Sequence, residues 1–147
     1  MEAITMELDI PIKVVGKERP RFNYAFKYAY TPRKTTDFEG KIAAHFDVYM
    51  KSLGLKAIEG PVRADVIFYI KVPKSWSKKK HYDALAKKLR PTKTPDVDNA
   101  LKAVFDGLNN VAYLDDKQIV SGSFDKFYDV VDSINIKINE IKKWVTG

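Results

Sequence analysis

Residues 62–72 constrain the fold more than any other segment, because every second residue along them is apolar. The apolar series comprises Val62, Ala64, Val66, Phe68, Ile70 and Val72. Successive side chains of a β-strand point to opposite faces, so this spacing predicts a strand with one buried face. Pro73 ends the strand, because proline has no backbone N–H to continue the ladder.

Two other segments show the same alternation. Residues 4–14 place apolar side chains at every second position, and the isoleucines within residues 131–139 do likewise, so each segment predicts a strand. Pro11 lies on the polar side of the first segment and argues for an edge strand or a bulge there. Further strands are expected at residues 28–31 and 117–128.

Three helices are expected between these strands. Thr36 and Glu39 have the spacing of a capping box and predict a helix over residues 36–53. A shorter helix is expected over residues 78–89, and apolar residues at helical spacing predict another over residues 97–109. The buried stripe of the first helix is expected to comprise Phe38, Ile42, Phe46, Tyr49, Met50 and Leu53.

This order of elements indicates the fold class. Strands and helices that mix in this way are typical of an α+β fold, here a small mixed β-sheet with covering helices. The sequence contains no internal repeat and no linker long enough to divide the chain. Residues 1–147 are therefore expected to form a single domain.

Composition narrows the class of function. The net charge of +7 and the pI of about 9.4 favour a polyanionic partner, with nucleic acid as the first candidate. The absence of cysteine excludes disulfides and thiolate metal sites. The first ten residues lack the pattern of a signal peptide, and no apolar run is long enough to span a membrane. We therefore expect a soluble, cytoplasmic protein.

Residues 94–118 are acidic in an otherwise basic chain. They contain five Asp and two Lys, a net charge of −3, so the rest of the chain carries +10. Asp96 and Asp98 lie where helix 97–109 begins, and one of them is expected to cap it. Asp115 and Asp116 follow that helix and lead into the next strand. Should this strand pack beside the helix start, three or four carboxylates converge.

Converging carboxylates repel one another unless a cation lies among them. Mg²⁺ prefers oxygen ligands and is commonly bound by carboxylates and substrate phosphates together. A Mg²⁺ site would therefore account for a cluster of acids within a basic, phosphate-binding chain. Such an ion could also assist the hydrolysis of a phosphodiester. Lys102, one turn after Asp98, is expected to pair with that carboxylate or to contact the phosphate that is cut. Asp106 continues the same helical face.

Plainer interpretations remain open for the same residues. An Asp at a helix start is often only a cap, and Asp98 with Lys102 is an ordinary i,i+4 pair. An EF-hand is excluded, because a loop that starts at Asp96 lacks the required glycine and glutamate. His45 and His81 are too isolated in the sequence for a zinc site or a catalytic triad.

The segment "PDVDNALKAVFDGLNN", followed by "YLDDKQIV", resembles the signature of the RusA family of Holliday junction resolvases. It contains D-x-D-N, a Lys four residues after the second Asp, a D-x-L step and D-D-x-Q-[IV]. The segments "GKERPRFN", "YTPRKT" and "VPKSW" are similar to the Gram-positive and phage-type members. The basic stretch at residues 74–93 is longer than in the shortest members, so its DNA contacts do not transfer.

The resemblance implies a homodimeric, Mg²⁺-dependent endonuclease that cuts four-way DNA junctions in recombination and repair, with Mn²⁺ as an alternative ion. It assigns the metal-binding acids to Asp96, Asp98 and Asp116 and the essential lysine to Lys102. Asp115 would support the metal site. A junction has two-fold symmetry, so paired nicks require two active sites related by that symmetry.

Basic residues outside the acidic segment are candidate DNA contacts. Phosphate contacts are predicted for Arg19, Arg21, Arg33, Lys34 and Lys93. A solvated basic surface is the alternative for each of them. Trp76 either stacks on a base at the junction centre or anchors its loop, and anchoring is the favoured interpretation.

Two other functions remain compatible with the sequence. One is a flap or branch nuclease without junction specificity, and the other is a non-catalytic module that binds branched DNA. A DxD nucleotide-sugar transferase is disfavoured, because nothing in the sequence resembles a nucleotide-binding fold.

Overall fold

A computed structural model of the chain describes residues 3–142. Within them, a four-stranded sheet has the order β1-β6-β4-β5 and a separate two-stranded hairpin is formed by β2 and β3. Strand β6 is antiparallel to both β1 and β4, whereas β4 and β5 are parallel, so the sheet is mixed. The sheet strands are β1 (Thr5–Ile10), β4 (Val62–Lys71), β5 (Ile119–Asp129) and β6 (Ser133–Glu140). The α+β prediction is confirmed.

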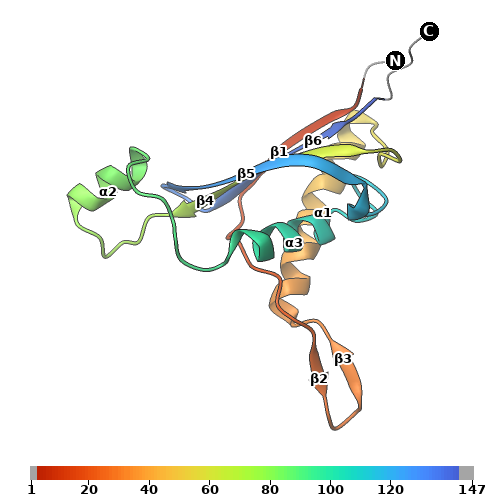
Figure 1. Ribbon diagram of the computed structural model, residues 1–147, viewed down its shortest axis with the longest axis horizontal. Helices are drawn as coiled ribbons and strands as arrows, with labels where there is room; N and C mark the ends of the chain where they lie inside the picture. Colours follow the sequence, from red (N-terminus) through yellow and green to blue (C-terminus); the bar gives the residue numbers. More distant parts are fainter. Residues whose placement is uncertain (1–2, 143–147) are drawn as a thin grey trace.

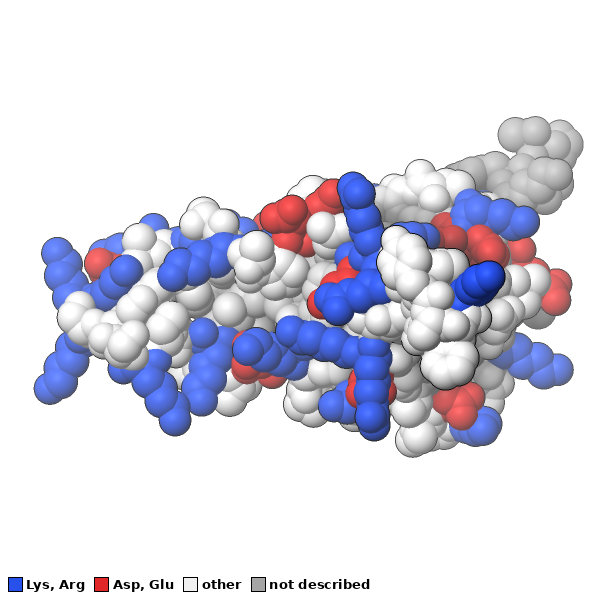
Figure 2. All heavy atoms as spheres, turned by 90° about the horizontal axis from the view of Figure 1, so that it is seen from below, with Lys and Arg blue, Asp and Glu red and all other residues white. Residues whose placement is uncertain are grey.

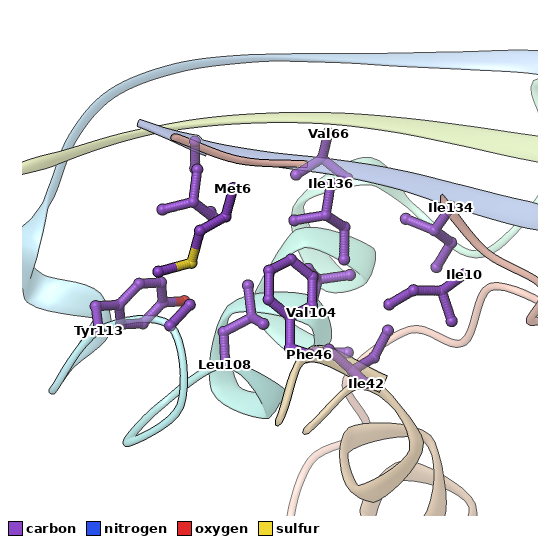
Figure 3. Close-up of a cluster of buried hydrophobic side chains, with 14 of the residues drawn as sticks. Met6, Ile10, Ile42, Phe46, Val66, Val104, Leu108, Tyr113, Ile134 and Ile136 are labelled. Carbon is purple, nitrogen blue, oxygen red and sulfur yellow. The ribbon is translucent and has the colours of Figure 1, made fainter. Parts of the chain in front are cut away.

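Helices α1 (Arg33–Leu53) and α3 (Val97–Gly107) lie on one face of this sheet (Figure 1). Their apolar side chains meet those of the strands in a common core, where Phe46, Val104 and Leu108 face Val66 and Ile136 (Figure 3). The buried residues of β4 and β6 are those that the alternating patterns identified. This core fixes α3, and with it the acidic segment, against the sheet.

A close helix crossing brings α3 onto α1. A Cβ atom added at Gly107 would lie 3.0 Å from the backbone oxygen of Glu39 and 3.1 Å from the Cβ of Ile42. Both distances are too short for comfortable contact, so a side chain at position 107 would push the helices apart. Glycine there lets Glu39 approach the C-terminal half of α3.

The first helix begins earlier than the capping box predicted. Helix α1 starts at Arg33 after Pro32, no side chain caps it, and Thr36 Oγ1 donates to the Arg33 carbonyl inside the first turn. The prediction of a start at Thr36 was therefore wrong. Proline sets the entry instead, since its fixed φ suits a helix boundary.

Other boundaries differ by a few residues. Strand β1 ends at Ile10, directly before Pro11, and lies at the sheet edge as expected. Helix α2 (Lys78–Leu85) is shorter than predicted, because Ala86 ends it and Lys87 has a positive φ of 64°. The hairpin strands are β2 (Arg21–Asn23), which the sequence did not reveal, and β3 (Tyr28–Tyr30).

Helix α2 and its flanking loops extend beyond one end of the sheet (Figure 1). The Trp76 ring packs edge-on against Tyr128 with centroids 5.1 Å apart, and Lys80 Nζ lies 4.0 Å from the Trp76 centroid. Arg90 stacks on Phe127 at 3.9 Å. These contacts tie the basic stretch to β5 and agree with Trp76 as an anchor.

No helix among residues 3–142 is both long enough and apolar enough to cross a membrane.

Candidate active site

The N-terminus of α3 holds two of the predicted acids. Asp96 occupies the N-cap position and Asp98 lies in the first turn, and both residues are exposed. Asp96 is the N-cap residue, as predicted, but its carboxylate accepts no capping hydrogen bond. Both carboxylates therefore face solvent at the positive end of the helix.

The backbone around this helix start is tightly packed. A Cβ added at Gly16 would lie 2.9 Å from the Cβ of Pro95, and Lys17 N donates to the Asn99 carbonyl at 2.9 Å. From the other side, Lys126 Nζ on β5 donates to the carbonyls of Lys93 (2.9 Å) and Pro95 (3.1 Å). The segment that carries Asp96 is thus held between the N-terminal loop and the sheet.

The second acidic pair sits in a 3₁₀ turn, η1 (Asp116–Gln118), which leads into β5. The Asp115 carboxylate accepts a hydrogen bond from Lys117 N at 2.9 Å, and this bond holds the pKa of Asp115 below its usual range. Gln118 locks the turn, because its Oε1 accepts from the backbone N of Leu114 and Asp115 while its Nε2 donates to two carbonyls. These carbonyls belong to Ile58 (2.7 Å) and Gly60 (2.8 Å).

Lys102 connects the helix to this turn. Its Nζ lies 3.0 Å from Asp106 Oδ1 and 3.2 Å from Asp116 Oδ2. The structure does not show the predicted pairing of Lys102 with Asp98. Lys102 pairs instead with Asp106, one helical turn towards the C-terminus. The hydrogen bonds to Asp106 and Asp116 raise the pKa of Lys102, so the amine is fully charged at neutral pH.

The ion pairs continue into the fold. Lys17 Nζ contacts the carboxylates of Glu39 on α1 and of Asp106, the latter at 3.3 Å. An alternating series of charges therefore runs Glu39–Lys17–Asp106–Lys102–Asp116. Its inner members are largely shielded from solvent, with Asp106 16% and Lys17 23% exposed, whereas Lys102 is 54% exposed.

Tyr113 shows that the acids lie close together. Its hydroxyl is buried below them and donates to the Phe105 carbonyl at 2.7 Å. Burial raises the pKa of Tyr113, and the negative charges of Asp116, Asp106 and Asp115 raise it further. Tyr113 is thus a buried residue near these three acids.

The donor set suits Mg²⁺, since every candidate ligand is a carboxylate. Nevertheless, within residues 3–142 no three Asp, Glu or His side chains are placed together so as to hold a metal ion. The cation found between Asp106 and Asp116 is the Lys102 ammonium. The metal ligands predicted from the sequence therefore stay a prediction.

The candidate DNA-binding residues are distributed around this site. Arg21 pairs with Glu18 at 3.3 Å and Arg33 with Asp37 at 3.6 Å, and Arg19 and Lys93 are exposed. Lys34 lines a hollow together with Thr94 and Pro95, directly before Asp96. Lys and Arg side chains are spread along the whole underside of the molecule (Figure 2).

The family model described as "Endodeoxyribonuclease RusA" matches residues 11–139. The chain belongs to this family. The RusA match covers every residue of the candidate site. Membership confirms the resemblance seen in the acidic segment.

A relative from Bacillus subtilis (strain 168), named "Uncharacterized protein YqaN", is 44% identical over 86 residues. The match covers 57% of this chain and 61% of that protein. The chain therefore spans less than two-thirds of the length of this curated relative.

Two residues of the site escaped the sequence analysis. Lys17 lies in "GKERPRFN", and nothing in the spacing of this segment points to Asp106. Gln118 belongs to the D-D-x-Q step, which was the available signal, but its role in holding the turn required the tertiary contacts to Ile58 and Gly60.

Proposed function

We propose that this RusA-family protein is a structure-selective endodeoxyribonuclease that resolves four-way DNA junctions by Mg²⁺-dependent phosphodiester hydrolysis. The observation that carries the proposal is the contact between Lys102 and Asp116. It joins the two halves of the acidic segment, 14 residues apart in the chain, at one exposed edge of the molecule.

In this proposal Asp96, Asp98 and Asp116 would hold the Mg²⁺ ion, with Asp115 beside them. The ion, when bound, activates a water molecule and stabilises the negative charge of the leaving oxygen. The protein's own part is to hold these acids on two rigid elements, the first turn of α3 and the turn locked by Gln118.

Lys102 would contact the scissile phosphate. Its amine stays protonated at neutral pH, so it serves as a cation and not as a general base. Asp106 fixes the ammonium from the buried side, while its exposed side remains accessible to a phosphate oxygen. Excess negative charge in the transition state is then stabilised by a preorganised cation.

We further propose that two copies of the chain act together. The two strands exchanged at a four-way junction are related by two-fold symmetry, so one homodimer can nick both at equivalent positions. Sedimentation velocity of the wild-type protein, alone and with junction DNA, tests this element separately from catalysis.

The deciding experiment compares wild type with Asp98→Asn on an end-labelled four-way junction, with and without millimolar Mg²⁺ or Mn²⁺. We expect paired, symmetric nicks from wild type only with metal. The Asp98→Asn protein should bind the junction equally well or more tightly, because one negative charge near the phosphates is removed, but should not cut it. Asp47→Asn, which changes an exposed acid of α1 paired only with Lys51, serves as the control that retains cleavage.

The outcomes separate the alternatives. Retained cleavage by Asp98→Asn would refute the assigned mechanism. Equal cutting of a flap or a linear duplex would indicate a branch nuclease without junction specificity. Binding without cutting by either protein, in both metals, would indicate a non-catalytic module for branched DNA.

A further inference from the structure

The β2–β3 hairpin exposes an unusual number of aromatic rings. It projects away from the sheet beyond the start of α1 (Figure 1), and none of its residues belongs to the hydrophobic core of the described chain. Tyr24 is 84% and Phe26 77% exposed, and the other rings of the hairpin are at least 40% exposed. The full set is Phe22, Tyr24, Phe26, Tyr28 and Tyr30. Such rings do not stabilise the fold of this chain.

The rings lie on both faces of the hairpin. The register pairs Phe22 with Ala29 and Asn23 with Tyr28, so Phe22 and Tyr24 share one face while Tyr28 and Tyr30 share the other. Their centroids are 4.9 Å apart on the first face and 5.9 Å apart on the second. Asn23 Oδ1 accepts from Phe26 N at 3.0 Å and so fixes the turn that presents Phe26.

Charge identifies the kind of partner that fits these rings. Residues 19–34 contain five cations and no acid. A hydrophobic surface of another protein would not require this charge, and a second copy of the same segment would repel it. Rings interleaved with cations are instead the composition of surfaces on which nucleic-acid bases stack while the backbone phosphates are neutralised.

The hairpin is rooted at the candidate active site. Lys17 N donates to Asn99 O in the first half of α3, and Glu18 N donates to Thr35 Oγ1 in α1 at 3.4 Å. From this root, six to seven extended residues place the tip about 20 Å away, at roughly 3.3 Å per residue. A strand held at Asp96 and Asp98 can therefore reach the hairpin while it remains bound.

We propose that the β2–β3 hairpin is a base-stacking element that binds unpaired or unstacked bases at the branch point of the DNA substrate. This inference rests on the proposed function and adds to it the feature that distinguishes a branch from a duplex. In a linear duplex the bases are stacked on one another and offer no free face to the rings. At an open branch point the terminal bases have such faces, and Tyr24 and Phe26 are the most exposed rings available to meet them.

The test measures binding without cleavage. The double variant Tyr24→Ala/Phe26→Ala is prepared in the Asp98→Asn background and compared with Tyr82→Ala in the same background, which removes a ring of α2 that is 66% exposed. Fluorescence anisotropy reports affinity for a four-way junction and for a linear duplex of the same length. A 2-aminopurine at the branch point reports stacking directly, because its fluorescence is quenched by a stacked ring.

We expect the double variant to lose about 5- to 150-fold in junction affinity for each ring that stacks, together with the quenching. Its duplex affinity should change little, and Tyr82→Ala should behave as the parent protein. Unchanged junction affinity and quenching in the double variant would overturn the stacking proposal and leave the proposed function intact. A parent protein with no preference for the junction would overturn both.

The alternative to base stacking is that the exposed hairpin forms a contact between two copies of the chain. Sedimentation velocity of the double variant decides it, because loss of a stacking surface leaves the oligomeric state unchanged. Conversion of a dimer to a monomer, with equal loss of affinity for junction and duplex, would overturn the proposal and assign the hairpin to assembly. Because both rings are exposed, the fold is expected to survive their removal, which circular dichroism verifies.

Discussion

The substitution Lys17→Met tests whether the buried charges support the site. Lys17 stands between Glu39 and Asp106, and the methionine preserves most of its apolar stem. Loss of the Lys17 ammonium leaves the carboxylates of Glu39 and Asp106 close together, while the other cation, Lys102, lies on the far side of Asp106. Lys102 should then be drawn towards Asp106 and away from Asp116.

The free energy of unfolding should fall by about 2 kcal/mol. Hydrogen bonds to charged groups contribute ~1.5–3 kcal/mol when shielded, whereas exposed ion pairs contribute ~0–1 kcal/mol. Side-chain exposures of 23% for Lys17, 20% for Glu39 and 16% for Asp106 place this triad in the lower part of the shielded range. A domain of this size loses roughly 2–4 °C of melting temperature per kcal/mol, so we expect a decrease of about 4–8 °C.

The effect has a defined pH dependence. Burial alone would lower the pKa of Lys17, but its hydrogen bonds to Glu39 and Asp106 outweigh burial and raise it above 10.5. A raised lysine pKa contributes stability that is fully present below the unfolded value and is lost as the pH rises through the folded value. The difference in stability between wild type and Lys17→Met should therefore be constant near neutrality and shrink above about pH 10.5.

Thermal unfolding followed by circular dichroism measures stability, and single-turnover cleavage of the junction measures the effect on chemistry. We expect the cleavage rate to fall more than the affinity for DNA, with partial rescue by Lys17→Arg. Lys13→Met, which removes an exposed lysine without a described ion pair, is the matched control. Equal melting temperatures for Lys17→Met and Lys13→Met, with equal cleavage rates, would refute the reasoning.

Three further substitutions test other contacts. Gln118→Glu replaces the amide that donates to Ile58 O and Gly60 O by a carboxylate, which cannot donate. Chemical denaturation should show that the free energy of unfolding falls by about 3 kcal/mol or more, and cleavage should be lost. Gly122→Ala would place a Cβ 2.1 Å from the Ala64 carbonyl oxygen and should prevent parallel pairing of β4 and β5, seen as a loss of cooperative unfolding. Tyr113→Phe removes the hydroxyl that donates to the Phe105 carbonyl, which keeps only its backbone donor Leu108 N, and should lower the free energy of unfolding by about 1 kcal/mol in the same assay.

The sheet and the helices that cover it could be predicted because their patterns are local. Alternation in β4 and β6 identified residues that are buried, whereas the apolar stripe of α3 identified the helix but only part of its buried side, which also includes Ala100, Ala103 and Gly107. The start of α1 could not be predicted in this way, because two local signals competed and Pro32 prevailed over the Thr36–Glu39 pattern. Strand β2 was missed because it is only three residues long and neither face of its hairpin is buried, so the alternation of its aromatic residues does not mark a side that faces the core.

The sequence predicted which acids lie around α3, but not which of them pairs with Lys102. Asp96, Asp98, Asp115 and Asp116 could be read from their spacing, since they flank one helix. The partner of Lys102 could not, because Asp98 and Asp106 are both one helical turn away and only tertiary structure decides between them. The turn that brings Asp116 to the C-terminal side of α3 makes Asp106 the partner.

This choice of partner explains how acids can gather in a basic chain without disrupting it. Asp106 is the most shielded carboxylate of the series and is neutralised from two sides, by Lys17 and Lys102. Asp96 and Asp98 take part in no ion pair among the described residues and remain open to solvent. The acids thus divide into those that form ion pairs within the fold and those that are open to solvent, to which the proposed function assigns the metal ion. Lys102 lies between the two groups, and in the proposed function it would exchange Asp116 for a phosphate oxygen while Asp106 still holds it.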